Sequence, residues 1–185
     1  MPTRIKSRRT APDLFTFGHS TRDLAEFMII LRAHGIRQLV DVRTIPRSRH
    51  NPQFNKGALG RLLRARRINY RHMKDLGGLR RARMDSTLNA GWRNASFRGY
   101  ADYMQTVEFD AALTKLVSIA AKKPAVIMCA EAVPWRCHRS MIADALTAKG
   151  FSVRHIMSPA AARLHKLNPM ARFRRGRVVY PRSRR

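Results

Sequence analysis

The chain has 185 residues, of which 44% are hydrophobic, so it is long enough for one domain with a buried core. Lysine and arginine number 38 against 11 acidic residues, a formal net charge of +27. No apolar run approaches the roughly 20 residues of a transmembrane helix, and the N-terminus lacks the apolar stretch of a secretory signal. Two cysteines do not make a disulfide framework. We therefore expect a cytoplasmic protein without a membrane partner.

The positive charge is concentrated in three acid-poor parts of the chain: a basic N-terminal extension at 1–12, the stretch 43–83, and the tail from Arg163 to the basic end at 182–185. Such a chain attracts polyanions, with an affinity that falls steeply as salt rises. Two explanations stay open at this point. One is a nucleic-acid partner, and the other is an arginine-rich proteome with little selection against surface charge.

The first half of the chain alternates short apolar runs with amphipathic stretches. An aromatic run at 14–20 predicts a buried strand, and the capping-box-like start at Ser20 predicts a helix after it. A second strand is predicted at 36–42. After a proline-containing loop, leucines at helical spacing predict a helix at 56–67, and 68–73 has the composition of a third strand.

The second half begins with an irregular basic stretch at 79–97, a length typical of functional or mobile loops. The pattern then returns to alternating helices and strands. In chain order, the predicted elements are a helix at 97–123 broken near Thr106, a strand at 124–130, a helix at 135–150, a strand at 151–157 and an edge strand at 176–181.

This alternation predicts the α/β class: a single domain at 13–181, with a mostly parallel sheet of about five strands covered by helices on both faces. In such sheets, ligands bind beyond the carboxyl ends of the strands. Reactive side chains follow several predicted strand ends. They are His19 and Ser20 after the first strand, Asp41 and Arg43 after the second, Cys129 and Glu131 after the fourth, and Cys137, His138 and Arg139 at the next helix start.

Both cysteines lie in the segment 128–140, and each has more than one interpretation. Cys129 is either a small buried hydrophobic residue or a catalytic group. Cys137 is expected in the first turn of a helix, where the dipole and the neighbouring His138 would lower its pKa. A reversible disulfide between the two cysteines is a third interpretation. The Cys-x7-Cys-His spacing is not a standard zinc pattern, so no metal site is predicted.

Four other strand-end residues are candidates for catalysis or binding. Glu131 is either a helix-entry cap or salt-bridge partner of Arg136 or Arg139, or else a general base or the residue that orients His138. Asp41 and Arg43 lie two apart and form either an internal ion pair or a substrate contact. His19, at a strand end, is a candidate proton carrier.

The loop before the 135–150 helix is a candidate anion site. Exposed N–H groups at a helix start, with arginines alongside, suit a phosphate. A Cys-x5-Arg phosphatase loop is excluded, because Cys129 and Arg136 are one residue too far apart and the expected glycines are missing. The candidate anion-binding residues are Arg43, Arg136, Arg139, Ser20, Ser48 and Asn51.

Several motifs together resemble a known family. The segments "TFGHSTRDLAEF", "DVRTIPRSRHNPQFN", "FRGYADYM" and "CAEAVPWRCHR" resemble the domain-of-unknown-function family numbered 488, over residues 14 to 181. The resemblance implies a soluble, mainly bacterial α/β protein, and the family name leaves the biochemical role open. Its signature positions fall here on His19, Ser20, Asp41, Arg43, Pro46, Ser48, Asn51, Pro52, Phe54, Gly77, Gly78, Cys129, Glu131, Cys137, His138 and Arg139.

We therefore predict a ligand or catalytic site at the carboxyl edge of the sheet, acting on a phosphate-bearing small molecule, a nucleotide or a nucleic acid. Cys137 or Glu131 would perform the chemistry, with His19 and His138 as proton carriers. Two alternatives stay open: a non-catalytic nucleic-acid-binding module that uses the basic loop and tail, and a cysteine-pair redox protein. The cofactor and the oligomeric state stay unassigned.

Overall fold

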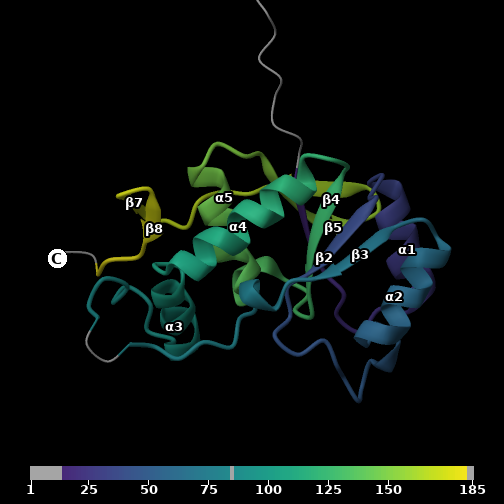
Figure 1. The fold of residues 1–185 in the computed structure, drawn as a ribbon, viewed down its shortest axis with the longest axis horizontal. Helices are drawn as coiled ribbons and strands as arrows, with labels where there is room; N and C mark the ends of the chain where they lie inside the picture. The colour runs from purple at the N-terminus through teal and green to yellow at the C-terminus, as the bar shows by residue number, and fades with distance from the viewer. Residues whose placement is uncertain (1–13, 84–85, 183–185) are drawn as a thin grey trace, which may run out of the picture.

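A computed structural model describes residues 14–83 and 86–182 (Figure 1). The predicted basic extension at 1–12 and most of the basic end lie outside the described residues. Within the part that is described, no helix is long and apolar enough to cross a membrane. The strands are β1 (Leu14–Gly18), β2 (Gln38–Asp41), β3 (Asn69–His72), β4 (Ala125–Cys129), β5 (Val153–Ser158), β6 (Ala161–Leu164), β7 (Arg172–Arg174) and β8 (Arg177–Val179).

Five α-helices and three single 3₁₀ turns connect these strands in the described residues. The α-helices are α1 (Leu24–Ala33), α2 (Lys56–Ala65), α3 (Ala95–Tyr103), α4 (Val107–Ala120) and α5 (Arg139–Ala148). The 3₁₀ turns are η1 (Pro52–Phe54), η2 (Lys74–Leu76) and η3 (Pro134–Arg136).

Six strands form one sheet in the order β3-β2-β4-β1-β5-β6. The first five are parallel, and β6 joins β5 in antiparallel register. All five residues of β4 are buried, because a parallel strand in the middle of a sheet is covered on both faces. The predicted α/β class with a mostly parallel sheet is therefore confirmed.

Helices cover both faces of the sheet, and each face has its own hydrophobic core. On one face, α1 and α2 pack Leu31 and Leu59 against Leu39 and Met128. On the other face, α3, α4 and α5 form a second core around Ile127. Figure 1 shows the two groups of helices on opposite sides of the strands.

The connections place an opening at the carboxyl edge of the sheet. After β1 and β2 the chain passes to α1 and α2 on one face, whereas after β4 it passes to α5 on the other. Since β4 lies between β1 and β2, the loops that follow these three strands diverge there. Ligands bind at such switch points in open α/β sheets.

Several element boundaries differ from the sequence-based expectation. Helix α1 begins after Asp23, whose side chain accepts the N–H of Glu26, and not at Ser20, which has a left-handed φ of 52°. Thr106 caps α4, so the predicted break is confirmed. The C-terminal strand is not an edge of the main sheet, because β8 pairs with β7 in a separate two-stranded sheet. Strands β6 and β7 were not predicted from the sequence.

Candidate functional site

Two neighbouring pockets open at the carboxyl edge of the sheet and share the residues Arg43, Ile45, Ala130 and Glu131. We call the larger one, of about 470 Å³, the thiol pocket, because Cys129, Cys137 and His138 line it. The smaller one, of about 420 Å³, is the hydroxyl pocket, and its lining includes Ser20, Ser48 and Asn51. Both volumes fall within the roughly 300–1,000 Å³ typical of small-molecule sites.

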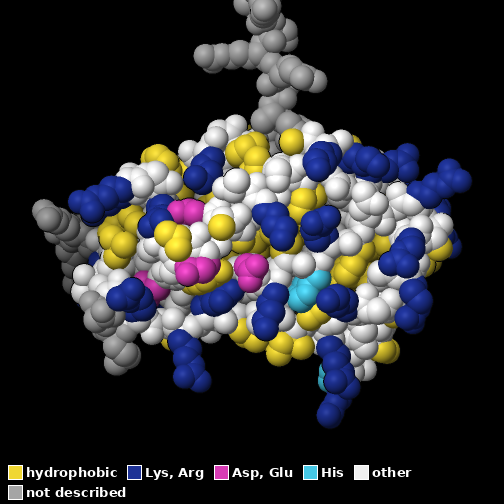
Figure 2. Space-filling view, in the orientation of Figure 1, with side chains coloured by type: hydrophobic (Ala, Val, Ile, Leu, Met, Phe, Trp, Pro, Cys, Tyr) yellow, Lys and Arg dark blue, Asp and Glu magenta, His cyan; other side chains and the backbone are white. Residues whose placement is uncertain are grey.

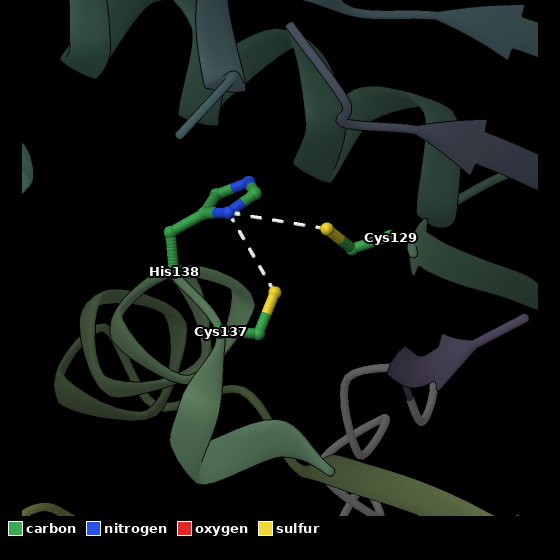
Figure 3. Close-up of side chains that lie close together, drawn as sticks. All are labelled: Cys129, Cys137 and His138. Atoms are coloured by element: carbon green, nitrogen blue, oxygen red, sulfur yellow. Dashed lines mark hydrogen bonds between the residues drawn. The ribbon is translucent and has the colours of Figure 1, made fainter. Parts of the chain in front are cut away.

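Cys129, Cys137 and His138 form a compact cluster at the thiol pocket (Figure 3). Cys129 ends β4, and the other two residues immediately precede α5. His138 Nδ1 lies 4.0 Å from the sulfur of Cys129 and 3.6 Å from that of Cys137. The three atoms all lie within 4.8 Å of one another. The strand end and the helix start therefore bring three nucleophilic or metal-ligating groups to one point.

The other ring nitrogen of His138 fixes the orientation of the imidazole. Nε2 lies 3.1 Å from the backbone carbonyl oxygen of Val42, and a carbonyl oxygen only accepts hydrogen bonds. Nε2 therefore carries the proton, and in the neutral ring the lone pair of Nδ1 is directed at the two sulfurs. Both thiols are free and buried.

The two thiols influence each other strongly. A hydrogen bond from Cys137 lowers the pKa of Cys129 well below its usual value, with smaller contributions from His138 and the charge of Arg139, against the opposing effect of burial. The same contact, together with burial, raises the pKa of Cys137. The expected lowering of the Cys137 pKa is therefore wrong. Cys137 has an extended backbone ahead of α5 rather than a place in its first turn.

Asp41 and Arg43 form an internal ion pair in the wall between the pockets. The guanidinium of Arg43 donates to both carboxylate oxygens of Asp41, at 2.9 and 2.6 Å, and to the carbonyl of Phe54 at 2.7 Å. Tyr70 also donates to Asp41, at 2.7 Å. Of the two interpretations left open for this pair, the structure gives the ion pair, although Arg43 also lines both pockets.

His19 belongs to the same wall and is 2% exposed. Its Nε2 lies 3.2 Å from Nη1 of Arg43, its Nδ1 lies 2.8 Å from the carbonyl oxygen of Ser20, and its ring stacks on Phe54. Burial lowers the pKa of His19, so the neutral ring accepts from Arg43 and donates to Ser20. Both ring nitrogens are engaged within the protein, an arrangement that positions Arg43.

Arg139 has a different place from the one expected of an anion ligand. It is 1% exposed and lines neither pocket. Its guanidinium donates to the carbonyl of Glu131 at 2.5 Å and to that of Ala132 at 2.8 Å. A side chain on Gly18 would collide with the Glu131 carbonyl. Arg139 therefore holds the loop after β4 against the end of β1.

The remaining predicted residues lie around the pocket openings. Glu131 is exposed and lines both pockets, and Arg136 is exposed in the thiol pocket. Ser48 Oγ accepts the N–H of Asn51 at 3.0 Å, so this pair shapes the loop beside the hydroxyl pocket. Glu131 thus lies at the junction of the two pockets.

Several lining residues are not among the catalytic and anion-binding residues predicted from the sequence. Arg47 lines the hydroxyl pocket, and Phe97 and Gly78 line the thiol pocket. A side chain at Gly78 would contact the ring of His138 at Nδ1, Cγ and Cε1. The sequence signal for Gly78 was its place among the signature positions of the resembled family. A glycine lets the backbone pass close to another group.

One comparison with known proteins identifies a family for the chain. The model of the family described as "Domain of unknown function DUF488" matches residues 23–146, more than half of the chain. The chain belongs to the DUF488 family. The matched range contains both cysteines and most of the two pockets' lining residues, and the suspected resemblance is confirmed. No curated protein and no solved structure matches the chain.

Proposed function

We propose that the chain binds a phosphate-bearing organic ligand across the two pockets and acts on it with the groups at the thiol pocket. The observation that carries this proposal is the convergence of Cys129, Cys137 and His138 on a pocket of ligand size at the sheet's switch point. Buried reactive groups beside a cavity mark functional sites more often than isolated ones do.

The charges around the pockets favour an anion. Among the lining residues, Arg43, Arg47 and Arg136 are cationic, and Glu131 is the one acid. Arg47 and Arg136 are exposed, so both are free to turn toward a ligand. Arginine binds phosphate oxygens through paired N–H groups, which suits it to this role.

The thiol pocket also has an apolar part. Ile45 and Leu79 are 64% and 71% exposed at its edge, and Phe97 forms another part of the lining. Apolar and aromatic surface beside arginines suits an organic phosphate such as a nucleotide better than inorganic phosphate. Glu131, between the pockets, is the candidate general base.

Binding of a mononucleotide and a short single-stranded oligonucleotide, measured by calorimetry at roughly physiological salt, tests this proposal. Arg136→Gln is expected to weaken binding about tenfold or more, because it removes a charge-assisted phosphate contact. Arg163→Gln, which removes an exposed arginine on the edge strand β6, is the matched control. Equal losses in both variants would point to non-specific charge attraction instead.

The charge distribution bears on the alternative of a non-catalytic nucleic-acid-binding module. Figure 2 shows Lys and Arg side chains spread over the whole visible face rather than gathered in one stripe. On that alternative, oligonucleotide binding would survive Cys137→Ser and Glu131→Gln and would weaken similarly when different surface arginines are replaced. On the proposed function, both variants stay folded and lose turnover or pocket binding.

A further inference from the structure

The cluster at the thiol pocket has the composition of a metal site. We propose that Cys129, Cys137 and His138 bind a zinc ion, whose fourth coordination position opens into the thiol pocket. Two thiolates and one imidazole with an open position form a known type of catalytic zinc site. Thiolate ligands also favour zinc over calcium, magnesium and manganese.

The distances between the ligand atoms fit tetrahedral coordination. With zinc–sulfur bonds of about 2.3 Å and zinc–nitrogen bonds of about 2.0–2.1 Å, sulfur and nitrogen ligands lie about 3.6 Å apart. The two observed sulfur–nitrogen distances are 3.6 and 4.0 Å. The two sulfurs lie within 4.8 Å, and about 3.8 Å is expected around zinc. To coordinate zinc, the sulfur and nitrogen atoms would therefore move by at most about 1 Å, which side-chain rotation allows.

The second shell has the form that a zinc-binding histidine requires. A metal-ligating imidazole almost always donates its other N–H to a carboxylate, a backbone carbonyl or water. His138 Nε2 is held by the carbonyl of Val42, which leaves Nδ1 for the metal. This contact comes from the loop after β2, independently of the two cysteines.

The charges favour paired thiolates with a dication. Helix α5 begins at Arg139, immediately after His138, and the positive end of the helix dipole stabilises nearby anions. Two thiolates balance the two charges of zinc. Binding releases the thiol protons to solvent, and no oxidant or reductant takes part.

Access to the cluster comes from the thiol pocket. Cys129, Cys137 and His138 are all lining residues, so an ion can enter and a ligand can reach the fourth position. Gly78 keeps its side of the imidazole clear, since any side chain there would meet the His138 ring.

The proposed zinc site is argued from its three ligand residues. Only the identity of the group at the fourth coordination position rests on the proposed function. At the fourth position, a ligand's phosphate or an activated water would bind the metal. Arg136 and Glu131 lie at the edge of the same pocket and would contact that group. A zinc-bound water has a strongly lowered pKa, which makes it a nucleophile near neutral pH.

Metal binding by the full chain tests the proposal without any phosphate ligand. Protein purified without chelator is expected to contain about one zinc per chain by elemental analysis. After metal removal, cobalt(II) should give thiolate charge-transfer absorption and intense tetrahedral bands. Cys137→Ser and His138→Gln should each weaken cobalt binding more than about a hundredfold, the upper loss for a second-shell residue.

The control is His34→Gln, since His34 Nε2 bonds the carbonyl of Ser158 far from the cluster. It should bind cobalt like the native chain. If a cluster variant fails to fold, thiol labelling of the native protein still tests the proposal, because bound zinc must protect both thiols from a thiol reagent. Unprotected thiols or an absent cobalt spectrum would overturn the zinc site. Loss of both thiols to an intramolecular disulfide on mild oxidation, without metal binding, would identify a redox pair instead.

Adding a mononucleotide to the cobalt form separates the two proposals. A change in the tetrahedral bands indicates a ligand at the fourth position. A normal cobalt spectrum with no nucleotide binding would overturn the proposed function and leave the metal site intact. Nucleotide binding without a cobalt spectrum would overturn the metal site alone.

Discussion

Two of the buried polar clusters in the described part of the protein look alike in composition and differ in which of their atoms are free to bind another group. In the first, His138 directs a ring nitrogen at the sulfurs of Cys129 and Cys137. In the second, Asp144, His165 and His155 form a chain of hydrogen bonds that ends at Thr16. Both combine histidines with other metal-ligating or nucleophilic side chains, so sequence composition alone does not separate them.

The second cluster is closed. His165 donates to Asp144 at 2.9 Å, and the two histidines are joined at 2.8 Å. His155 Nδ1 lies 2.7 Å from the hydroxyl of Thr16. Tyr180 donates to the other oxygen of Asp144 at 2.7 Å. Each ring nitrogen therefore has a partner, and the chain of bonds attaches the C-terminal tail to α5 and the sheet.

The two clusters therefore differ in the availability of their atoms rather than in residue type. The cysteine–histidine cluster lines a pocket and leaves Nδ1 and two sulfurs facing one another. The histidine–aspartate chain satisfies its own donors and acceptors. We therefore expect substitutions in the first cluster to affect binding and those in the second to affect stability.

The largest effect is expected from Asp144→Ala. The Asp144 carboxylate accepts hydrogen bonds from His165, Tyr180 and the N–H of Asn168. Removing an acceptor from a buried charged network costs about 3–5 kcal/mol, measurable by urea unfolding. Asp144→Asn should cost less because it keeps one acceptor. If Asp144→Ala left the unfolding midpoint unchanged, the closed network would not be a stabilising one.

Gly78→Ala is expected to act on metal binding rather than on folding. The added methyl group would push the His138 ring away from the sulfurs. We expect cobalt affinity to fall about ten- to hundredfold, the range for a disturbed second shell, with a far smaller change in the urea midpoint. Unchanged cobalt affinity would mean that the backbone moves aside and that Gly78 does not set the ring position.

Stability is expected to fall as the pH is lowered from about 6.5 to about 4. Burial, with repulsion from His165 and Arg139, lowers the pKa of His155 to about 4 from 6.5. In that window the unfolded chain binds more protons than the native chain, so acid favours unfolding. Since the ring is partly exposed, we expect a loss of about 1–2 kcal/mol.

Thermal unfolding at several pH values measures this loss, and the His155→Asn variant should show a flatter dependence. His19, whose pKa is also lowered by burial, contributes in the same direction and remains in the variant. An identical pH profile for the variant and the native chain would place the titrating group elsewhere.

The smallest effect is expected from Gly60→Ala, which also serves as the matched control for Gly78→Ala. Gly60 lies inside α2, and an added methyl group would make an ordinary contact of 3.6 Å with Tyr70. Alanine should stabilise the helix by about 0.5–1 kcal/mol and leave cobalt binding unchanged. A loss of cobalt binding here would show that glycine substitutions disturb the pocket non-specifically.

The sequence predicted the order of strands and helices because apolar runs and helical spacing are local signals. It also predicted that reactive side chains gather at the carboxyl edge, since that follows from parallel strands. It did not predict the strand β6, whose four residues are mostly exposed and lack an alternating pattern. The separate β7–β8 hairpin was likewise hidden, because strand pairing is not a property of one segment.

The contacts that form the two polar clusters join residues from different segments of the chain. Cys129 and Cys137 meet only because the loop between them folds back, held by Arg139, so their spacing gave no zinc pattern. Thr16 and His155 are 139 positions apart. Arg139 was predicted to bind an anion. Its guanidinium instead donates to carbonyl groups of the loop after β4, and the path of that loop is not evident from the sequence.

Helix α5 connects the two clusters. Its N-terminal end follows Cys137 and His138, and its middle carries Asp144, which holds the C-terminal tail through Tyr180. A ten-residue helix is short and rigid, so the C-terminal tail and the thiol pocket are both held in place by α5. Proteolytic cleavage within the exposed strand β7, or deletion of the chain beyond the β7–β8 hairpin, would therefore weaken the support of the pocket without changing any residue that lines it.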